Sequence, residues 1–293
     1  MSTLWTVQKI LKWTIDFFEK KGLPDARLSA ELLLAHVLKI RRLDLYLQFE
    51  RILTTQERQA YKKLVQRRAT REPLQYIIGK AEFYGMVFSV TPAVLIPRPE
   101  TELLVDAVIE HFRQSSVEHP YIVDVGTGSG CMAIAIKYHL PQATVVGVDI
   151  SEAALVVARE NAQHYGVAID WVMADGVQFL MEQQHRWDAI VSNPPYISSM
   201  EWPTLEPEVR EFEPRQALVA GKSGLEFYQR LIPVAHQRLH PGGILAMEMG
   251  YAQGDALQQL LETQGFQYKF VKDYQQHNRM VIGYHEQRKQ ENY

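Results

Sequence analysis

Short apolar runs alternate with helix-patterned stretches from Tyr121 onward, and this alternation restricts the fold more than any other feature of the sequence. Five such runs precede residue 250: Tyr121–Val125, Thr144–Asp149, Ile169–Met173, Trp187–Val191 and Ile244–Met249. Strands that alternate with helices are typical of a parallel sheet covered by helices on both faces. Two later runs are expected to form an antiparallel hairpin at the edge of this α/β sheet: Gly265–Lys272 and Arg279–Tyr284.

Residues 1–72 have a purely helical pattern. Apolar residues recur at helical spacing from Val7 to Phe18, and again from Leu28 to Leu38 after a break at Gly22-Leu23-Pro24. A third helix is predicted to begin at Thr54, because Glu57 three positions later completes a capping box. A small helical domain is therefore expected before residue 73.

Residues 73–97 differ from both neighbouring regions. The runs Gln75–Ile78 and Phe83–Val90 are rich in β-branched and aromatic residues and are separated by a glycine, so they predict a β-hairpin that links two domains. The segment Ile96-Pro97-Arg98-Pro99-Glu100-Thr101-Glu102 then opens a helix, with Pro99 suited to its first turn.

The charge of the chain is unevenly distributed. The 293 residues are 46% hydrophobic and 22% charged, which is typical of a soluble globular protein. Residues 1–72 hold 15 Lys/Arg against 8 Asp/Glu, so they carry +7 and the rest of the chain carries −10. A basic front end suits an acidic protein or a nucleic acid, but no tight basic cluster with interleaved aromatics is present. Solvated helix faces are the favoured interpretation.

Several other site classes are excluded or disfavoured. Cys131 is the only cysteine, so neither an internal disulfide nor a cysteine-based zinc site is possible. The thiol is expected to be a small buried apolar group rather than a reactive one, and a reducing cytoplasm fits. No run approaches the roughly 20 apolar residues of a membrane span. His236 and His240 are four apart, but Pro241 ends any helix there, and no metal site is expected.

A glycine-rich loop follows the first strand and precedes a helix: Asp124-Val125-Gly126-Thr127-Gly128-Ser129-Gly130. Its glycines let a ligand approach the backbone N–H groups closely. The dinucleotide-binding fingerprint has another spacing, because here Gly128 and Gly130 are only two apart. Asp149 ends the next strand, where a carboxylate can accept both hydroxyls of a ribose. A nucleoside-containing cofactor is expected, and a helix cap before Ser151 is the alternative role for Asp149.

Polar residues also end the next two strands. Asp175 closes the third strand, where it can accept from an adenine amino group or form a turn with Gly176. Asn193 closes the fourth. Ligands of open α/β sheets bind at the carboxyl edge of the strands, so Asp124, Asp149, Asp175 and Asn193 are expected at one site.

The tetrapeptide Asn193-Pro194-Pro195-Tyr196 predicts a seat for a planar NH2 group. The asparagine side chain offers an acceptor, and the proline pair keeps a backbone carbonyl rigid and unpaired. The tyrosine can stack on the flat face of the incoming group. A proline turn that merely ends a strand is the alternative.

An acidic loop follows, with Arg210 and Arg215 interspersed among its carboxylates: Glu201, Glu206, Glu208, Glu211 and Glu213. We interpret this run as a solvated loop rather than as a paired acid/base site. Gly221-Lys222-Ser223 resembles the end of a phosphate-binding loop. Such a loop also needs a glycine five positions earlier, and Gln216 occupies that position.

With these motifs, the chain resembles the class I S-adenosylmethionine-dependent methyltransferases, and among them the family that methylates glutamine in class I peptide release factors. The glycine loop is similar to that of the whole superfamily, and Asn193 to Tyr196 to that of enzymes acting on exocyclic or amide nitrogens. Ile96 to Glu102 resembles the release-factor branch rather than the sister branch that modifies a ribosomal protein. The chain departs from the family pattern at Ala220–Leu225 and at Gly176, where an aromatic residue is usual.

The resemblance implies a Rossmann-like fold with a seven-stranded, mostly parallel sheet in residues 98–287. Residues 1–72 are then a helical substrate-recognition domain, residues 73–97 a hairpin linker, and residues 288–293 a polar tail. The implied cofactor is S-adenosylmethionine, bound by the loop and strand-end residues Gly126, Thr127, Gly128, Ser129, Gly130, Asp149, Asp175, Gly176 and Asn193.

The implied reaction is methylation of the glutamine side-chain nitrogen in the Gly-Gly-Gln motif of release factors. Asn193, Pro194 and Tyr196 are the implied catalytic residues, and together with Pro195 they bind the substrate. A cytoplasmic monomer is expected, without membrane contact or stable nucleic-acid binding. The alternatives are a methyltransferase acting on a ribosomal protein or on an exocyclic amine of DNA or RNA, and a non-catalytic binding module.

Overall fold

The computed structural model describes residues 4–286, so the predicted polar tail 288–293 lies outside the described residues. The chain folds into two compact units. The first combines Met1–Lys80 with Glu206–Phe212, and the second combines Ala81–Leu205 with Glu213–Tyr293. The segment Glu206–Phe212 therefore leaves the larger unit, in sequence terms, to join the smaller one.

The smaller unit is helical and has its own core. Its elements are α1 (Val7–Lys20), α2 (Ala26–Leu38), α3 (Asp44–Leu47), α4 (Thr55–Ala69), α5 (Leu74–Ile78) and α10 (Pro207–Phe212). Phe18, Leu33, Leu34 and Tyr61 are fully buried between these helices. The capping box is confirmed, because the Glu57 N–H donates to the Thr54 hydroxyl and the Thr54 N–H donates to the Glu57 carboxylate.

Part of the acidic loop belongs to this helical unit, and our interpretation of it as solvated is wrong at Glu208. The Glu208 carboxylate accepts from Arg71 at 3.1 Å and lies 3.5 Å from the Arg68 guanidinium. Arg68 is only 4% exposed. Since Glu208 lies 137 residues from Arg71, no local pattern signals this ion pair.

The predicted strand at Gln75–Ile78 is also wrong, because Leu74–Ile78 forms α5. Tyr76 and Ile77 are buried there, and Gly79 ends the helix in the left-handed conformation at φ 77°. The hairpin itself is present but shorter, with β1 (Lys80–Phe83) and β2 (Met86–Ser89). Packing against the helical core thus outweighs the β-branched composition of the segment.

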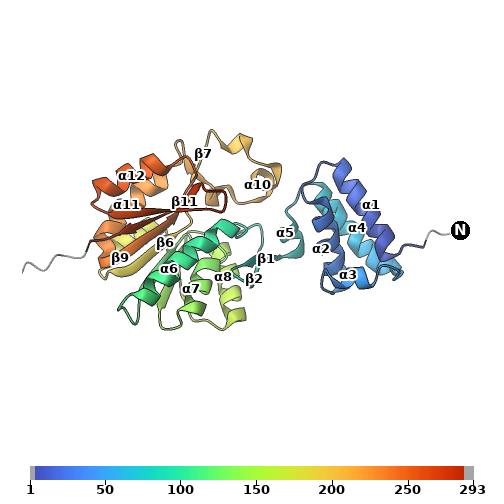
Figure 1. Cartoon of the computed structure of the whole chain (residues 1–293), viewed down its shortest axis with the longest axis horizontal. Coiled ribbons are helices and arrows are strands. Elements are labelled where there is room, and N and C mark those ends of the chain that lie inside the picture. Colours follow the sequence, from blue (N-terminus) through green and yellow to red (C-terminus); the bar gives the residue numbers. More distant parts are fainter. Residues whose placement is uncertain (1–3, 287–293) are drawn as a thin grey trace, which may run out of the picture. The chain divides into compact units, whose positions relative to one another are not determined.

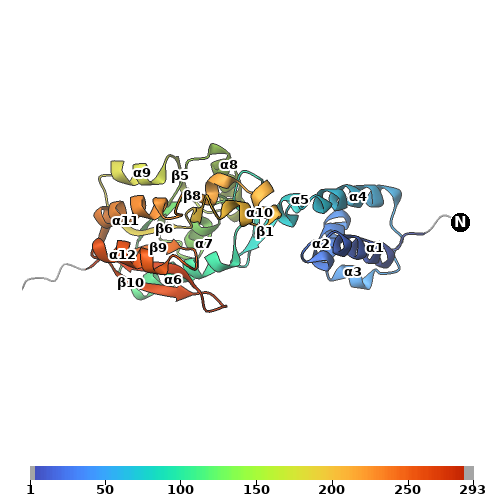
Figure 2. The ribbon, with the colours of Figure 1, turned by 90° about the horizontal axis from the view of Figure 1, so that it is seen from above.

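The larger unit contains the predicted seven-stranded sheet, in the order β10-β11-β9-β6-β3-β4-β5. The strands are β3 (Tyr121–Val125), β4 (Thr144–Asp149), β5 (Asp170–Met173), β6 (Trp187–Ser192), β9 (Leu239–Glu248), β10 (Gln267–Lys272) and β11 (Asn278–Tyr284). Four pairings are parallel, and β11 pairs antiparallel with both β9 and β10. Figure 2 shows β10 and β5 at opposite edges of this sheet.

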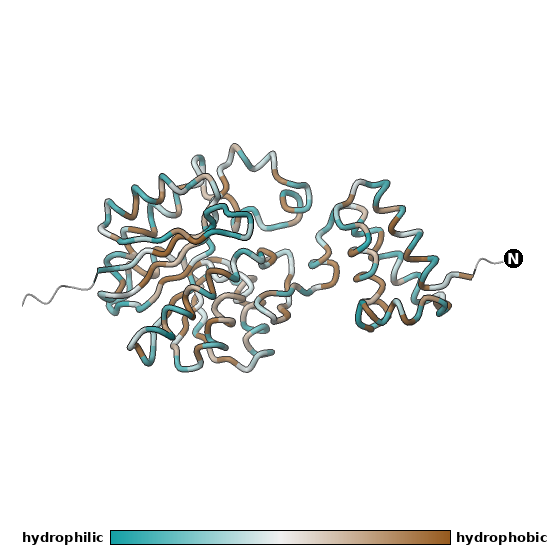
Figure 3. Tube along the Cα trace, viewed as in Figure 1, coloured by the Kyte–Doolittle hydropathy of each residue, from teal (hydrophilic) through white to brown (hydrophobic). Residues whose placement is uncertain are grey.

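Helices cover both faces of the sheet, as the alternation predicts (Figure 1). One face carries α6 (Glu102–Gln114), α7 (Cys131–His139) and α8 (Glu152–Tyr165), and the other carries α9 (Gly176–Glu182), α11 (Glu226–Arg238) and α12 (Gly254–Thr263). Successive strand residues such as Ile122 and Val123 enter opposite cores. Figure 3 shows the central strands in the brown of apolar residues.

Several short helices and strands lie in the segments between the main elements of this unit. They are η1 (Pro99–Thr101), η2 (Trp202–Thr204), η3 (Arg215–Ala217), β7 (Ile197–Ser198) and β8 (Val219–Gly221). Pro99 begins η1, which leads directly into α6, so the predicted helix start is confirmed. Within the seven-stranded sheet, the strand predictions hold within two residues, except that β9 begins five residues before Ile244.

Gly147 in β4 gives a test of how tightly this sheet is packed. An added Cβ at Gly147 would lie 2.3 Å from Cζ3 of Trp171, whose ring also lies against Gly130. We expect Gly147→Ala to lower the free energy of unfolding by about 1–3 kcal/mol through overpacking, measured by urea denaturation. Gly254→Ala is the matched control, because its Cβ would find ordinary contacts from 3.6 Å outward. Equal stability of the two variants would contradict this packing.

Candidate functional site

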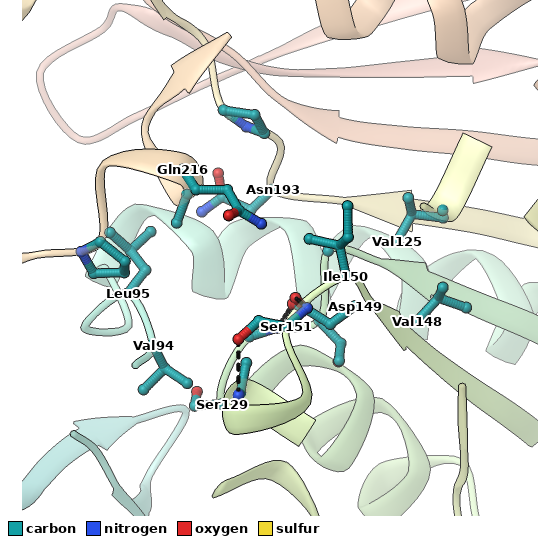
Figure 4. Close-up of a pocket in the computed structure, with 18 of the residues that line it drawn as sticks. Val94, Leu95, Val125, Ser129, Val148, Asp149, Ile150, Ser151, Asn193 and Gln216 are labelled. Carbon is teal, nitrogen blue, oxygen red and sulfur yellow. Dashed lines mark hydrogen bonds between the residues drawn. The ribbon is translucent and has the colours of Figure 1, made fainter. Parts of the chain in front are cut away.

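A cavity of about 350 Å³ opens where β3, β4, β5 and β6 end. Its lining comes from the loops after these strands and from the segment Ala93–Thr101 that precedes α6. Figure 4 shows Asn193 and Gln216 on one side of this cavity and Ser129 and Asp149 on the other. Its volume is that of a small-molecule site.

The glycine loop is pinned to β4 at the floor of the cavity. The N–H groups of Gly126 and Thr127 both donate to the Val148 carbonyl, at 2.8 and 3.0 Å. Gly126 and Gly128 have φ of 77° and 56°, and an added Cβ at either would meet no atom within 4 Å. Glycine is therefore needed there for the backbone conformation, and it leaves the loop bare on the cavity side.

Asp149 ends β4 and holds the loop in place. Its carboxylate accepts from the Gly128 N–H and from the Ser151 N–H, each at 2.9 Å. The cap of α8 is Ser151, whose hydroxyl accepts from Ala154, so the alternative role of Asp149 as the helix cap is wrong. Burial raises the pKa of Asp149 above its usual value. The carboxylate keeps further lone pairs toward the cavity that it lines.

Asp124, expected at the same edge, lies beneath the loop and does not line the cavity. It is fully buried, and its carboxylate accepts from the Thr127 hydroxyl at 2.7 Å. Burial raises the pKa of Asp124 to about 7. Its position supports the loop from below and gives it no direct contact with a ligand in the cavity.

Asp175 and Gly176 both line the cavity, but Asp175 already has several partners. It caps α9 by accepting from Val177 and Gln178, and it pairs with Arg230 at 2.9 Å. Burial tends to raise the pKa of Asp175, but the hydrogen bonds from Gln178 and Arg230 outweigh it, so this pKa lies below its usual value. The alternative role in a turn with Gly176 is replaced by that of a helix cap, and the contact with an adenine amino group stays a prediction.

Gly176 departs from the aromatic residue that is usual in the resembling family, for a steric reason. An added Cβ there would lie 2.4 Å from Cγ1 of Val125, at the end of β3. Any larger side chain at this position requires a smaller one on β3. Apolar lining near this position comes instead from other side chains, such as Ile150.

Cys131 follows the loop at the first position of α7 and lines the cavity. Burial raises the pKa of its thiol to about 12. The prediction of a small buried residue is confirmed, and the raised pKa agrees with an unreactive thiol.

Asn193 lies between two hollows of the site. It lines the large cavity together with Pro195, and it also lines a pocket of about 20 Å³ together with Pro194 and Tyr196. Its Nδ2 donates to the Thr101 hydroxyl at 3.1 Å. The tetrapeptide thus forms a partition with the large cavity on one side and its own small pocket on the other.

Sequence reasoning missed several residues of this partition. Arg98 and Leu95 line both pockets, Thr101 lines the large cavity, and Glu248 lines the small pocket and accepts from the Thr101 hydroxyl. Gln216 extends from η3 into the large cavity (Figure 4). The only sequence signal was the family-like stretch from Ile96 to Glu102, since Glu248 lies within an apolar strand and Gln216 within the loop that we interpreted as solvated.

That interpretation is also wrong at Glu213, which is 6% exposed. Its carboxylate pairs with Arg98 and accepts from the Ile96 N–H at 3.2 Å. Glu213 therefore holds the segment before α6 against the cavity. Its partners lie more than 100 residues away in the sequence, at separations of 115 and 117.

Within residues 4–286, no group of three or more His, Cys, Asp or Glu side chains is arranged to hold a metal ion. The ring centroids of His236 and His285 lie 4.7 Å apart in an edge-to-face contact, but no third potential metal-binding side chain lies beside them among these residues. None of the helices in the same part of the chain has the length and apolar character needed to cross a membrane.

Comparison with known proteins gives two family matches. Residues 9–79 match the family described as PrmC N-terminal domain, and residues 100–205 match the methyltransferase small domain. Among solved structures, a methyltransferase from Pyrococcus furiosus superposes with a TM-score of 0.52 at 18% identity, covering 70% of this chain and 91% of that one. This similarity shows the methyltransferase fold.

Two curated relatives match along almost the whole sequence. A release factor glutamine methyltransferase from Chlorobaculum tepidum is 46% identical over 279 residues, covering 92% of this chain and 94% of its own. One from Geobacter sulfurreducens is 42% identical over 263 residues, covering 90% of both chains. With this identity over both units, and with the strand-end cavity and its Asn193 partition, the chain belongs to the release factor glutamine methyltransferase family.

Proposed function

We propose that this chain transfers a methyl group from S-adenosylmethionine to the side-chain nitrogen of the glutamine in the Gly-Gly-Gln motif of class I release factors. The observation that carries the proposal is the position of Asn193 between a cavity large enough for a nucleoside cofactor and a small pocket walled by Pro194 and Tyr196. A methyl donor on one side and an amide on the other would meet at this residue.

The residues of the large cavity fit the cofactor. Asp149 offers a carboxylate to ribose hydroxyls, and the bare loop from Gly126 to Gly130 lets the ligand approach the backbone. Asp175 and Gly176 border the same cavity, and Ile150 supplies an apolar wall for a flat base. S-adenosylmethionine supplies a methyl group made electrophilic by a sulfonium.

The substrate amide needs careful positioning, because its nitrogen lone pair is delocalised into the carbonyl. We propose that the Asn193 Oδ1 and the Pro194 carbonyl each accept one hydrogen bond from the NH2 group of the substrate glutamine. As positive charge develops on the nitrogen, these two fixed acceptors stabilise it. Pro195 keeps the turn rigid, and Tyr196 packs against the amide plane. No side chain is assigned as a general base, and the proton leaves to solvent after transfer.

Residues 1–72 are proposed to recognise the release factor. They carry +7, whereas the remainder of the chain carries −10, so an acidic surface on the substrate would be steered to this part. The chain is proposed to act as a monomer in the cytoplasm. The negative charge of the catalytic unit is unfavourable for a nucleic-acid substrate, which must bring its phosphates to the same cavity.

The direct test supplies labelled S-adenosylmethionine and, in separate reactions, a release factor, its Gly-Gly-Gln variant with Gln replaced by Ala, a ribosomal protein, DNA and RNA. We expect label in the intact release factor alone. Label in nucleic acid or ribosomal protein, with none in the release factor, would replace the proposed substrate.

Replacing Asn193 tests the assigned acceptor. We expect Asn193→Ala to lower kcat by about 100-fold or more, because one preorganised partner of the developing charge is lost. Cofactor affinity, measured by isothermal titration, should change little. Asn278→Ala is the control, since Asn278 begins β11 and lines neither pocket. Wild-type turnover of the Asn193 variant would refute its assignment.

Replacing Asp149 tests the cofactor site separately. Loss of hydrogen bonds to a charged group costs about 1.5–3 kcal/mol, so Asp149→Ala should weaken cofactor binding by about 10- to 100-fold. The control is Asp170→Ala, because Asp170 is an exposed aspartate at the opposite end of the neighbouring strand β5. Equal dissociation constants for the two variants would remove Asp149 from the site.

A further inference from the structure

The small pocket lined by Asn193 and Tyr196 is also lined by a buried carboxylate, Glu248, to which the proposed reaction assigns no role. Glu248 ends β9 and is 2% exposed, and its Oε2 accepts from the hydroxyl of Thr101, which is 3% exposed. Its Oε1 accepts from the Tyr196 hydroxyl at 3.2 Å. Thr101 in turn accepts from Asn193 Nδ2 at 3.1 Å. One carboxylate is thus linked to both polar side chains of the tetrapeptide.

The chemistry of these groups determines which way each bond runs. An ionised carboxylate only accepts hydrogen bonds, so both hydroxyls must donate to it. Thr101 has one hydroxyl hydrogen, and Glu248 receives it. Only a lone pair of Thr101 then remains for Asn193, and a lone pair can be met by the NH2 group but not by the oxygen of the amide. The Asn193 Oδ1 is therefore turned away from Thr101 and is free to accept.

Burying this carboxylate is costly, and its surroundings offset the cost only in part. No side-chain cation lies within ion-pair distance of Glu248 among the described residues, and the nearby Arg279 is paired with Asp273 at 3.0 Å. A well-packed apolar residue at such a position would often be at least as stable. The presence of a carboxylate here fits a role in specifying bond direction rather than in stabilising the sheet.

We propose that Glu248 is a positioning residue, which through Thr101 fixes the amide orientation of Asn193 and through the Tyr196 hydroxyl fixes the tyrosine ring. The inference deepens the proposed methyl transfer and rests on it. It also gives a role to Thr101, which lies in the family-like stretch from Ile96 to Glu102. That stretch contacts the tetrapeptide through this hydroxyl.

Protonation of Glu248 would undo the arrangement. A neutral carboxyl group has a hydrogen of its own to donate, which releases the Thr101 hydrogen to bond the Asn193 oxygen instead. The amide would then present two donors to a substrate that also brings donors.

The pH dependence follows from the groups that face this carboxyl. Burial raises the pKa of Glu248, helped by the charge of Glu100, while the hydroxyls of Thr101 and Tyr196 and the charge of Arg279 oppose the rise. The fifth neighbour, Tyr228, donates only to the Glu248 backbone carbonyl. Activity is therefore expected at pH values above this raised pKa and to fall as pH decreases through it.

The test compares four variants of the full chain in kcat, KM for the release factor, cofactor affinity by titration, and the pH profile of kcat. Glu248→Gln keeps the shape but replaces one acceptor oxygen by a donor. Thr101→Val removes the linking hydroxyl, and Thr101→Ser restores it. Tyr228→Phe is the matched control, because it removes a buried hydroxyl bonded to Glu248 at 2.8 Å through the main chain only.

We expect Glu248→Gln and Thr101→Val to lower kcat by between about 10- and 100-fold, the range for a misplaced catalytic group. Cofactor affinity should stay unchanged, Thr101→Ser should retain most of kcat, and Tyr228→Phe should resemble the wild type. The acidic limb of the wild-type profile should be absent in Glu248→Gln. Wild-type kcat in Glu248→Gln, or an equal loss in Tyr228→Phe and Thr101→Val, would overturn the proposal.

These outcomes are separable from failure of the proposed substrate. If the wild type leaves the release factor unlabelled but labels a ribosomal protein or a nucleic acid, the assigned substrate is wrong. The same variants are then compared on the substrate that is labelled, where the kcat ratio between Glu248→Gln and Tyr228→Phe still decides whether Glu248 positions Asn193.

Discussion

The register of the parallel strands is the constraint on which the site depends. Val125 pairs with Val148, Asp149 with Met173, and Asp124 with Val191. The strands β3, β4, β5 and β6 therefore end at nearly one level, and the loops after them open on one cavity. A slip of one residue would turn every strand side chain to the opposite face. The apolar cores on both faces thus hold the polar strand ends in place.

The carboxylates around this edge differ in how they are satisfied, and the differences indicate their roles. Glu213 is buried but has a full partner in Arg98, which suits a structural clamp. Asp175 forms an ion pair with Arg230 and caps the N-terminus of α9. Asp124 and Glu248 are buried with only hydroxyl partners among the described side chains, and burial raises both pKa values. Buried carboxylates with raised pKa values and no cationic partner are typical of functional sites rather than of hydrophobic cores.

Sequence patterns predicted those parts of the structure that depend on neighbours in the chain. The five parallel-type runs, the capping box at Thr54 and the helix start at Pro99 all have local causes. The segment Gln75–Ile78 was assigned wrongly because its composition favours a strand, whereas its tertiary contacts favour a helix. The acids Glu208 and Glu213 lie in a charged loop, and only contacts with arginines distant in the sequence show that Glu208 is half-buried and Glu213 buried in ion pairs.

The same limit explains why half of the proposed catalytic arrangement could not be predicted from the sequence. Asn193 and Tyr196 are recognisable because they lie in four consecutive residues, but the groups that bond them, and that we propose orient them, come from η1 and from the end of β9, at separations of 92 and 52 residues. Thr101 and Glu248, 147 residues apart, acquire meaning only as neighbours. The proposed substrate seat therefore has two components: a short motif that supplies acceptors, and a distant network that determines which atom of the motif accepts. The stretch from Ile96 to Thr101 is held by Glu213 at its start and by Glu248 at its end, so both components are anchored to the same sheet edge.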